Sequence, residues 1–276
     1  MAGRDGEGWS SCIRKTLGAV GLYDRGLKNA QGIQLKHHDV AARNLPTVFE
    51  GFTILHISDL HIDMNPGAIA RLLEILDELK FDICVLTGDY RGKTFGPFDE
   101  AIEGLTLLRP SLGELVYGVL GNHDTARMVP AMEEIGVQTL LNESVVVERA
   151  NQRFYLAGVD DAHFYKTDDI AKAASQIPSA HFSILLSHTP EIYERAADAD
   201  FDLLLSGHTH GGQICLPGSF PITLCADLPR YMGAGAWKYR QILGYTSVGV
   251  GSSLVPVRFN CPPEIALHHL QVATGC

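Results

Sequence analysis

Residues 52–61 read FTILHISDLH, and this stretch decides the fold, because a run typical of a β-strand ends there in a polar cluster. Residues 52–58 are mostly β-branched, aromatic and aliphatic, which is the composition of a buried strand. Ser58, Asp59 and His61 follow where that strand should end. In α/β proteins the carboxyl ends of strands border the ligand crevice. The stretch therefore predicts both a core strand and one corner of a functional site.

The sequence beyond this stretch repeats the succession of strand, polar cluster and helix. Apolar side chains at positions 69, 72, 73, 75, 76 and 79 follow Pro66-Gly67 and predict an amphipathic helix over residues 69–79. Further strands are predicted at residues 81–86, 115–120, 144–147, 154–159, 181–186, 201–205, 239–250 and 265–270, and helices at residues 101–108, 128–135 and 170–174. Residues 211–235 are rich in glycine and proline and should form a long ordered loop. Strands that alternate with helices predict an α/β layered fold.

One compact domain is predicted over residues 31–276, because a chain of 276 residues that is 46% hydrophobic can bury one large core. Residues 1–30 are polar and glycine-rich, and they are predicted to be a flexible or peripheral lead-in. Ile13, Leu17 and Val20 have helical spacing beside basic residues. This segment could be a weak membrane-surface helix or a short helix packed on the domain.

The net charge and the cysteines limit the partners and the compartment. A formal net charge of -10 argues against bulk nucleic-acid binding, because phosphate backbones need Lys and Arg to displace counterions. The six cysteines form no CxxC pair, which favours a reducing, cytoplasmic location over a disulfide framework. No apolar run approaches the roughly 18 residues of a membrane span. Contact with the inner membrane would therefore be peripheral.

Five polar clusters stand where predicted strands end. They are Ser58-Asp59-Leu60-His61, Gly88-Asp89, Gly121-Asn122-His123-Asp124, Ser187-His188 and Gly207-His208-Thr209-His210. Imidazole, carboxylate and amide groups suit zinc, iron and manganese-like ions, and the lack of thiolates argues against a structural zinc site. Asp-x-His and His-x-His place two side chains on one face of an extended segment. Seven candidate ligands are too many for one tetrahedral ion, but they suffice for two ions with a bridging carboxylate.

The other histidines are interpreted as structural groups. His56, His163 and His181 have no matching partner motif. The pairs His37-His38 and His268-His269 would point to opposite faces of a strand, which makes them poor chelators. Three further acidic residues are interpreted as solvated loop residues, with a supporting role at the site as the alternative: Asp63, Asp160 and Asp161.

The clusters in their order resemble a family signature. The set Asp59-x-His61, Gly88-Asp89, Gly121-Asn122-His123-Asp124, His188 and Gly207-His208-x-His210 resembles that of the calcineurin-like metallophosphoesterases. The resemblance implies two mixed β-sheets packed face to face and flanked by helices, and a binuclear phosphoester hydrolase. The extension Gly211-Gly212-Gln213 resembles a narrower bacterial branch. That branch holds YaeI/YkuE-type phosphodiesterases and an enzyme of lipid A biosynthesis that cleaves UDP-2,3-diacylglucosamine.

The resemblance also implies a role for each residue of the set. Asp59, His61 and His210 would hold one divalent metal, Asn122, His188 and His208 would hold a second, and Asp89 would bridge the two. Mn, Fe and Zn are the candidate ions. His123 would bind no metal and would face the phosphoryl group as general acid or charge stabiliser. The implied reaction is the attack of a metal-activated hydroxide on phosphorus.

One segment departs from the family pattern. Many relatives carry a second acidic residue shortly after Gly-Asp, and it orients the catalytic histidine. Here Asp89 is followed by Tyr90-Arg91-Gly92-Lys93. Asp124 or Asp63 could orient His123 instead, and Asp124 is also a candidate substrate-binding residue. Arg91 could contact a substrate phosphate.

The residues after the His-x-His cluster bear on the substrate. Residues 214–237 contain Leu216, Phe220, Tyr231, Met232 and Trp237, which would either form an apolar wall for acyl chains or a nucleobase, or pack the sheet edge. The expected substrate is a phosphodiester or pyrophosphate that is nucleotide- or lipid-linked. One alternative is a related hydrolase of cyclic nucleotides, glycerophosphodiesters or phosphoproteins. A non-catalytic binding scaffold is the other, and the complete ligand set argues against it.

Overall fold

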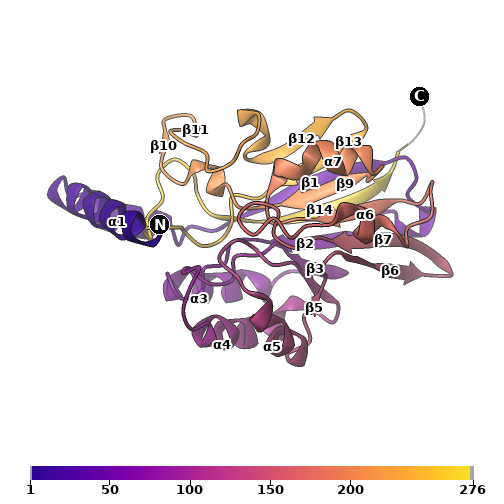
Figure 1. Cartoon of the computed structure of the whole chain (residues 1–276), viewed down its shortest axis with the longest axis horizontal. Helices are drawn as coiled ribbons and strands as arrows, with labels where there is room; N and C mark the ends of the chain where they lie inside the picture. Colours follow the sequence, from indigo (N-terminus) through magenta and orange to yellow (C-terminus); the bar gives the residue numbers. More distant parts are fainter. Residues whose placement is uncertain (1, 274–276) are drawn as a thin grey trace.

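Two six-stranded mixed sheets packed face to face form the centre of the computed structural model, which describes residues 2–273 (Figure 1). The first sheet has the order β1 (Gln34–Ala42), β14 (Glu264–Val272), β2 (Thr53–Ile57), β3 (Ile83–Leu86), β4 (Val116–Gly118) and β5 (Gln138–Thr139). The second has the order β12 (Gly235–Tyr239), β13 (Ile242–Thr246), β9 (Leu203–Ser206), β8 (Ser183–Leu186), β7 (Gln152–Gly158) and β6 (Glu143–Arg149).

Helices cover the outer face of each sheet, so the molecule has four layers. The helices α3 (Pro66–Leu76), α4 (Asp99–Leu108) and α5 (Val129–Glu134) lie on the first sheet, and α6 (Ile170–Ala174) and α7 (Tyr193–Asp198) lie on the second (Figure 1). Side chains alternate between layers along each strand. Ile83 and Val85 of β3 join the core between the sheets, whereas Cys84 and Leu86 face the helices. The predicted fold class is confirmed.

The parallel strands give the polar clusters a common direction. In the first sheet β2, β3 and β4 are parallel, and in the second β7, β8, β9 and β13 are parallel. Each cluster lies in the loop just after one of these strands. Because parallel strands end on the same edge of a sheet, loops from distant parts of the sequence can meet there.

No strand was predicted at β1 or β5, and two predicted segments have a different structure. Residues 239–250 do not form one strand, because β12 and β13 make an antiparallel hairpin that turns at Arg240, where φ is 48°. The apolar character continues through the turn, so hydropathy alone does not reveal it. Residues 211–235 are mostly loop, but they include the small hairpin of β10 (Cys215–Leu216) and β11 (Phe220–Pro221).

The amino-terminal segment is helical. The helix α1 (Ala2–Ala19) extends away from the sheets in Figure 1, and α2 (Tyr23–Asn29) lies against the domain. A side chain at Gly26 of α2 would collide with Val257 and Phe259, so this helix sits close to the loop before β14. Among residues 2–273, no helix is both long and apolar enough to cross a membrane.

Candidate metal centre

The loops that follow the parallel strands carry a strained backbone at the predicted ligand positions. Five of the seven predicted ligands have a positive φ: Asp59 (51°), His61 (39°), Asp89 (56°), His208 (72°) and His210 (49°). Non-glycine residues in this region cost of order 1–3 kcal/mol each and cluster at functional sites. The surrounding fold therefore holds these side chains in conformations that they would not adopt alone.

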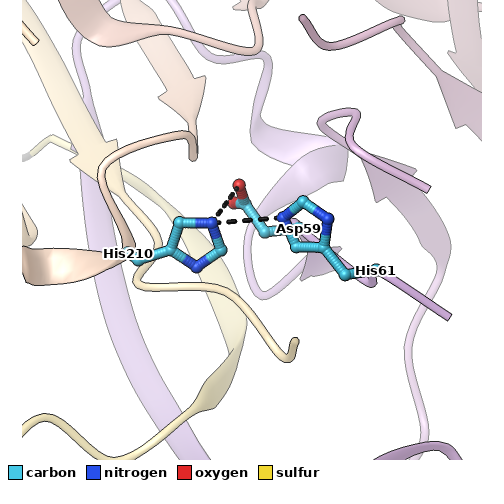
Figure 2. Close-up of side chains that lie close together, drawn as sticks. All are labelled: Asp59, His61 and His210. Carbon is cyan, nitrogen blue, oxygen red and sulfur yellow. Dashed lines mark hydrogen bonds and ion pairs between the residues drawn. The ribbon is translucent and has the colours of Figure 1, made fainter. Parts of the chain in front are cut away.

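Asp59, His61 and His210 meet at a single buried point (Figure 2). The Nε2 atoms of His61 and His210 lie 3.2 Å apart, and Nε2 of His210 lies 3.4 Å from Oδ1 of Asp59. The other oxygen of Asp59 accepts hydrogen bonds from the Ser58 hydroxyl at 2.6 Å and from the His208 backbone at 3.0 Å. The backbone N–H of His208 also reaches Oδ1 at 3.2 Å, so the carboxylate is held firmly while Oδ1 faces the ring of His210.

A second group gathers around His188. Its Nε2 lies 3.0 Å from Oδ1 of Asn122, 3.2 Å from Nδ1 of His208 and 3.3 Å from Oδ2 of Asp89. The same Oδ2 atom of Asp89 lies 3.7 Å from Nε2 of His61 in the first group. One carboxylate oxygen therefore stands between the two groups, and all seven predicted ligands come together.

Backbone carbonyls fix the direction of three of the rings. The contacts are His61 Nδ1 to Arg91 O (2.9 Å), His188 Nδ1 to Thr87 O (2.8 Å) and His208 Nε2 to Cys225 O (2.8 Å). A carbonyl only accepts, so the contacting nitrogen carries the proton and the opposite nitrogen of a neutral ring turns a lone pair toward the centre. Histidines that bind metals are oriented in this way. The donor set therefore fits divalent cations.

The charges of the buried groups also call for a cation. Burial raises the pKa of Asp59 to about 6. Burial would raise the pKa of Asp89 as well, but His188 and His123 hold it well below its usual range. Burial lowers the pKa of His188, yet the adjacent Asp89 carboxylate outweighs this and raises it to about 10. A proton on His188 balances the buried carboxylates, and a metal cation bound there would take over this charge and leave the ring neutral, as a ligand must be.

Two glycines let the loops approach these carboxylates. A Cβ atom at Gly121 would collide with the Asp89 side chain, and one at Gly207 would collide with Ser58 and with the Asp59 carboxylate. Both glycines precede predicted ligands by one residue. Close backbone approach, rather than loop flexibility, is what requires glycine here.

His123 lies at the edge of the centre beside the first group. Its ring meets that of His61 edge to face at 5.2 Å, and its Nε2 lies 3.9 Å from Oδ2 of Asp89. Burial lowers the pKa of the imidazole. The partner of Nδ1 is the hydroxyl of Thr94 at 3.3 Å, instead of Asp124 or Asp63 as the sequence suggests. Asp63 accepts from the backbone of Gly92.

Asp124 and Arg91, the two residues predicted to bind substrate, are hydrogen-bonded to backbone groups of the loops around the centre. The buried carboxylate of Asp124 accepts from the backbone N–H groups of Asp89, Tyr90 and Gly121 and so ties two loops together. The guanidinium of Arg91 donates to the carbonyl oxygens of His123, Thr94 and Gly96, at 2.6, 2.6 and 2.9 Å. These hydrogen bonds shape the loop that carries His123, and substrate contact by either residue stays a prediction.

Sequence reasoning missed two other features of the site. His163 was interpreted as structural, but its ring lies 4.2 Å from that of His208, centroid to centroid. It follows β7 in the stretch Asp160-Asp161-Ala162-His163, so a sixth polar cluster after a strand could have signalled it. Arg258 is fully buried behind His210 and donates to the carbonyl oxygens of Val248 and Gly251. Nothing in its sequence context signals this position.

Comparison with known proteins places the matched region over the same loops. The sequence model described as Calcineurin-like phosphoesterase matches residues 52–212. The uncharacterized metallophosphoesterase YkoQ of Bacillus subtilis is 31% identical, over 79% of this chain and 83% of that protein. The phosphodiesterase YaeI of Escherichia coli is 29% identical, over 79% of this chain and 82% of its own. The transmembrane protein with metallophosphoesterase domain of Danio rerio is 29% identical over 92% of this chain, which spans 60% of that relative.

Proposed function

We propose a reaction and a substrate class from one premise: this chain belongs to the calcineurin-like phosphoesterase family and is therefore a metal-dependent phosphoester hydrolase. The family, the bacterial branch and the enzyme class predicted from the sequence are thereby confirmed. The proposed reaction is hydrolysis of a phosphodiester or pyrophosphate bond at a binuclear centre. The observation that carries it is the convergence of the seven predicted ligands into two groups, with the Oδ2 atom of Asp89 between them.

In this proposal Asp59, His61 and His210 hold one divalent cation, and Asn122, His188 and His208 hold the other. Asp89 bridges them. Mn, Fe and Zn suit this mixture of imidazole, carboxylate and amide ligands. When bound, two such ions supply the Lewis acidity that activates water near neutral pH and neutralise charge on the phosphoryl oxygens.

His123 is proposed to face the phosphoryl group. Its Nδ1 is engaged by Thr94, and the rest of the ring is turned toward Asp89 with the side chain 20% exposed. From this position Nε2 can hydrogen-bond an ester oxygen and transfer a proton to the leaving group. General acid assistance of this kind contributes roughly 10²–10⁴-fold to rate.

Exposed apolar side chains on the loops next to the centre support a lipid-linked or nucleotide-linked substrate. They are Phe95, Phe164, Tyr165, Phe220, Ile222 and Tyr231. Phe95 follows Thr94, the two aromatic residues follow His163, and the others lie in the loop whose Cys225 carbonyl contacts His208. Met232 and Trp237 take no part, because both are buried in the core of the second sheet. UDP-2,3-diacylglucosamine combines an acyl-bearing lipid, a nucleotide and a pyrophosphate.

The segment 1–30 and the cellular location belong to the same proposal. Residues 31–276 would form the catalytic domain, and α1 with the exposed Val20 that follows it would contact the surface of the inner membrane from the cytoplasmic side. A peripheral contact of this kind would bring the apolar rim close to a lipid-linked substrate.

The test is hydrolysis by the purified full chain loaded with Mn, Fe or Zn. Bis-p-nitrophenyl phosphate and UDP-2,3-diacylglucosamine are compared with a cyclic nucleotide, a glycerophosphodiester and a phosphopeptide. The expected result is two metal ions per chain and turnover of the first two substrates.

His123→Ala should lower kcat by about 10²–10⁴-fold with both metals retained. His181 is exposed and distant from the centre, so His181→Ala should match the parent. Turnover of the phosphopeptide alone would overturn the diester proposal, and an unchanged kcat in His123→Ala would remove the role of His123.

A further inference from the structure

His163 stands beside the second group of predicted ligands, on a loop that is firmly held. The carboxylate of Asp161, 1% exposed, accepts hydrogen bonds from the backbone of His163, Phe164 and Tyr165 at 3.2, 2.8 and 2.6 Å. These three contacts fix the loop after β7 in a tight turn. The imidazole of His163 is thereby directed at the ring of His208.

A carboxylate fixes the orientation of the ring itself. Oε2 of Glu191 accepts from Nδ1 of His163 at 2.6 Å and from the Thr189 hydroxyl at 2.9 Å. Its other oxygen accepts from the backbone of Asp227 at 2.7 Å. Glu191 therefore joins the loops after β7 and β8 to the segment between β11 and β12. A carboxylate that accepts from one ring nitrogen of histidine leaves the opposite nitrogen free for chemistry.

His163, Glu191 and His208 also lie close enough to bind a cation, but their hydrogen bonds argue against it. Nε2 of His208 is engaged by the Cys225 carbonyl, and its Nδ1 faces His188. Both oxygens of Glu191 already accept from N–H or O–H groups. In contrast, Nε2 of His163 has no hydrogen-bond partner among residues 2–273. One free ring nitrogen remains, next to the centre and 33% exposed as a side chain.

His123 and His163 occupy matching positions on the two sides of the centre. His123 lies against His61 of the first group, and His163 lies against His208 of the second. Each ring has one nitrogen fixed by a neighbour, Thr94 in one case and Glu191 in the other. A phosphoryl group bound between the two groups would thus have an imidazole at either end.

We propose that His163 is a second substrate-contacting residue of this site, with Glu191 as its positioning residue. The inference rests on the proposed function, because it assumes that a phosphoryl group binds at the centre. With both ring nitrogens protonated beside the Glu191 carboxylate, His163 donates from Nδ1 to Glu191 and from Nε2 to a phosphoryl oxygen on the side of His208. A hydrogen bond to a charged group contributes about 1.5–3 kcal/mol, and so is expected to change an affinity by about 10- to 100-fold.

The experiment measures binding of inorganic phosphate to the metal-loaded full chain by calorimetry, alongside metal content and kcat/KM for bis-p-nitrophenyl phosphate. His163→Ala should raise the Kd for phosphate by about 10- to 100-fold and lower kcat/KM by a similar factor, with the metal content unchanged. Glu191→Gln keeps an acceptor oxygen and should have a smaller effect on both. His181→Ala, which lies far from the centre, is the matched control.

A structural role for His163 predicts a different pattern. It would lower Tm and leave the Kd for phosphate in the folded fraction as in the parent chain, which would overturn the proposal. Loss of one metal ion per chain in His163→Ala would overturn it too, because His163 would then be a ligand. If His163→Ala does not fold, 15N resonances of His163 in the unsubstituted protein give the answer: phosphate should shift Nε2, and an unchanged resonance contradicts the contact. Activity of the unsubstituted protein tests the proposed function separately.

Discussion

The molecule has two sets of buried or half-buried histidines, and they have different surroundings. His61, His188, His208 and His210 surround the carboxylates of Asp59 and Asp89 at the ends of parallel strands. The second set spans neighbouring strands of the first sheet and consists of His38, His268 and His56. Nδ1 of His38 lies 2.9 Å from Nδ1 of His268, whose Nε2 lies 3.3 Å from Nδ1 of His56. The ring of Tyr245, from the second sheet, packs against all three.

The comparison shows that a close carboxylate can outweigh burial, as it does for His188 but not for the other rings of the first set. In the second set burial lowers the pKa of His38, His56 and His268, and His56 reaches about 3, so these rings stay neutral. In the first set Asp89 overrides the effect of burial on His188. The two sets meet at Thr87, whose hydroxyl contacts His56 and whose carbonyl accepts from His188.

Removing the negative charge of Asp89, which distinguishes the first set of histidines from the second, should have the largest effect on activity. Asp89→Asn keeps the shape of the side chain but leaves the centre with one carboxylate in place of two. We expect it to lose at least one metal ion and to lower kcat/KM by about 10³-fold. Metal analysis by mass spectrometry and assays with bis-p-nitrophenyl phosphate measure both. His56→Gln, in the other set, should retain its metals, and two ions per chain in Asp89→Asn would contradict the assigned bridge.

Lowering the pH should destabilise the fold through the second set of histidines. The pKa of His56 is about 3 in the fold and 6.5 in the unfolded chain, so the unfolded state binds more protons below pH 6.5. Its contribution is therefore complete above pH 6.5 and is lost as the pH falls toward 3. Between about pH 7.5 and about pH 5 this amounts to about 2 kcal/mol. Urea unfolding of the metal-free chain should show a loss larger by that amount than in His56→Gln, and equal losses would exclude His56 as the source.

The smallest effect is expected at Thr94, which only orients the ring of His123. Thr94→Val removes the hydroxyl that contacts Nδ1 of His123 and preserves the size of the side chain. A single neutral hydrogen bond contributes about 0.5–1.5 kcal/mol, so kcat should fall by about 2- to 10-fold with KM and metal content unchanged. Thr94→Ser should restore the rate. A loss as large as that of His123→Ala would mean that Thr94 does more than orient the ring.

The sequence alone determined most of the core strands, the order of the polar clusters and the set of seven donors, but not β1, β5 or the hairpin of β12 and β13. Strand periodicity marks where each strand ends, and parallel strands bring those ends to a common edge. The residue types at these ends then limit the chemistry to hard and borderline cations. For this reason the gathering of Asp59, Asp89 and His188 could be expected without coordinates.

Only the tertiary structure decided the partners of the remaining side chains. Arg91 and Asp124 were expected at the substrate but are hydrogen-bonded to backbone groups, while Thr94 and Glu191 orient His123 and His163. A hydrogen bond depends on positions within about 3.5 Å and on the direction of the donor. Those positions are set by how loops from different strands pack, which no local pattern in the sequence records.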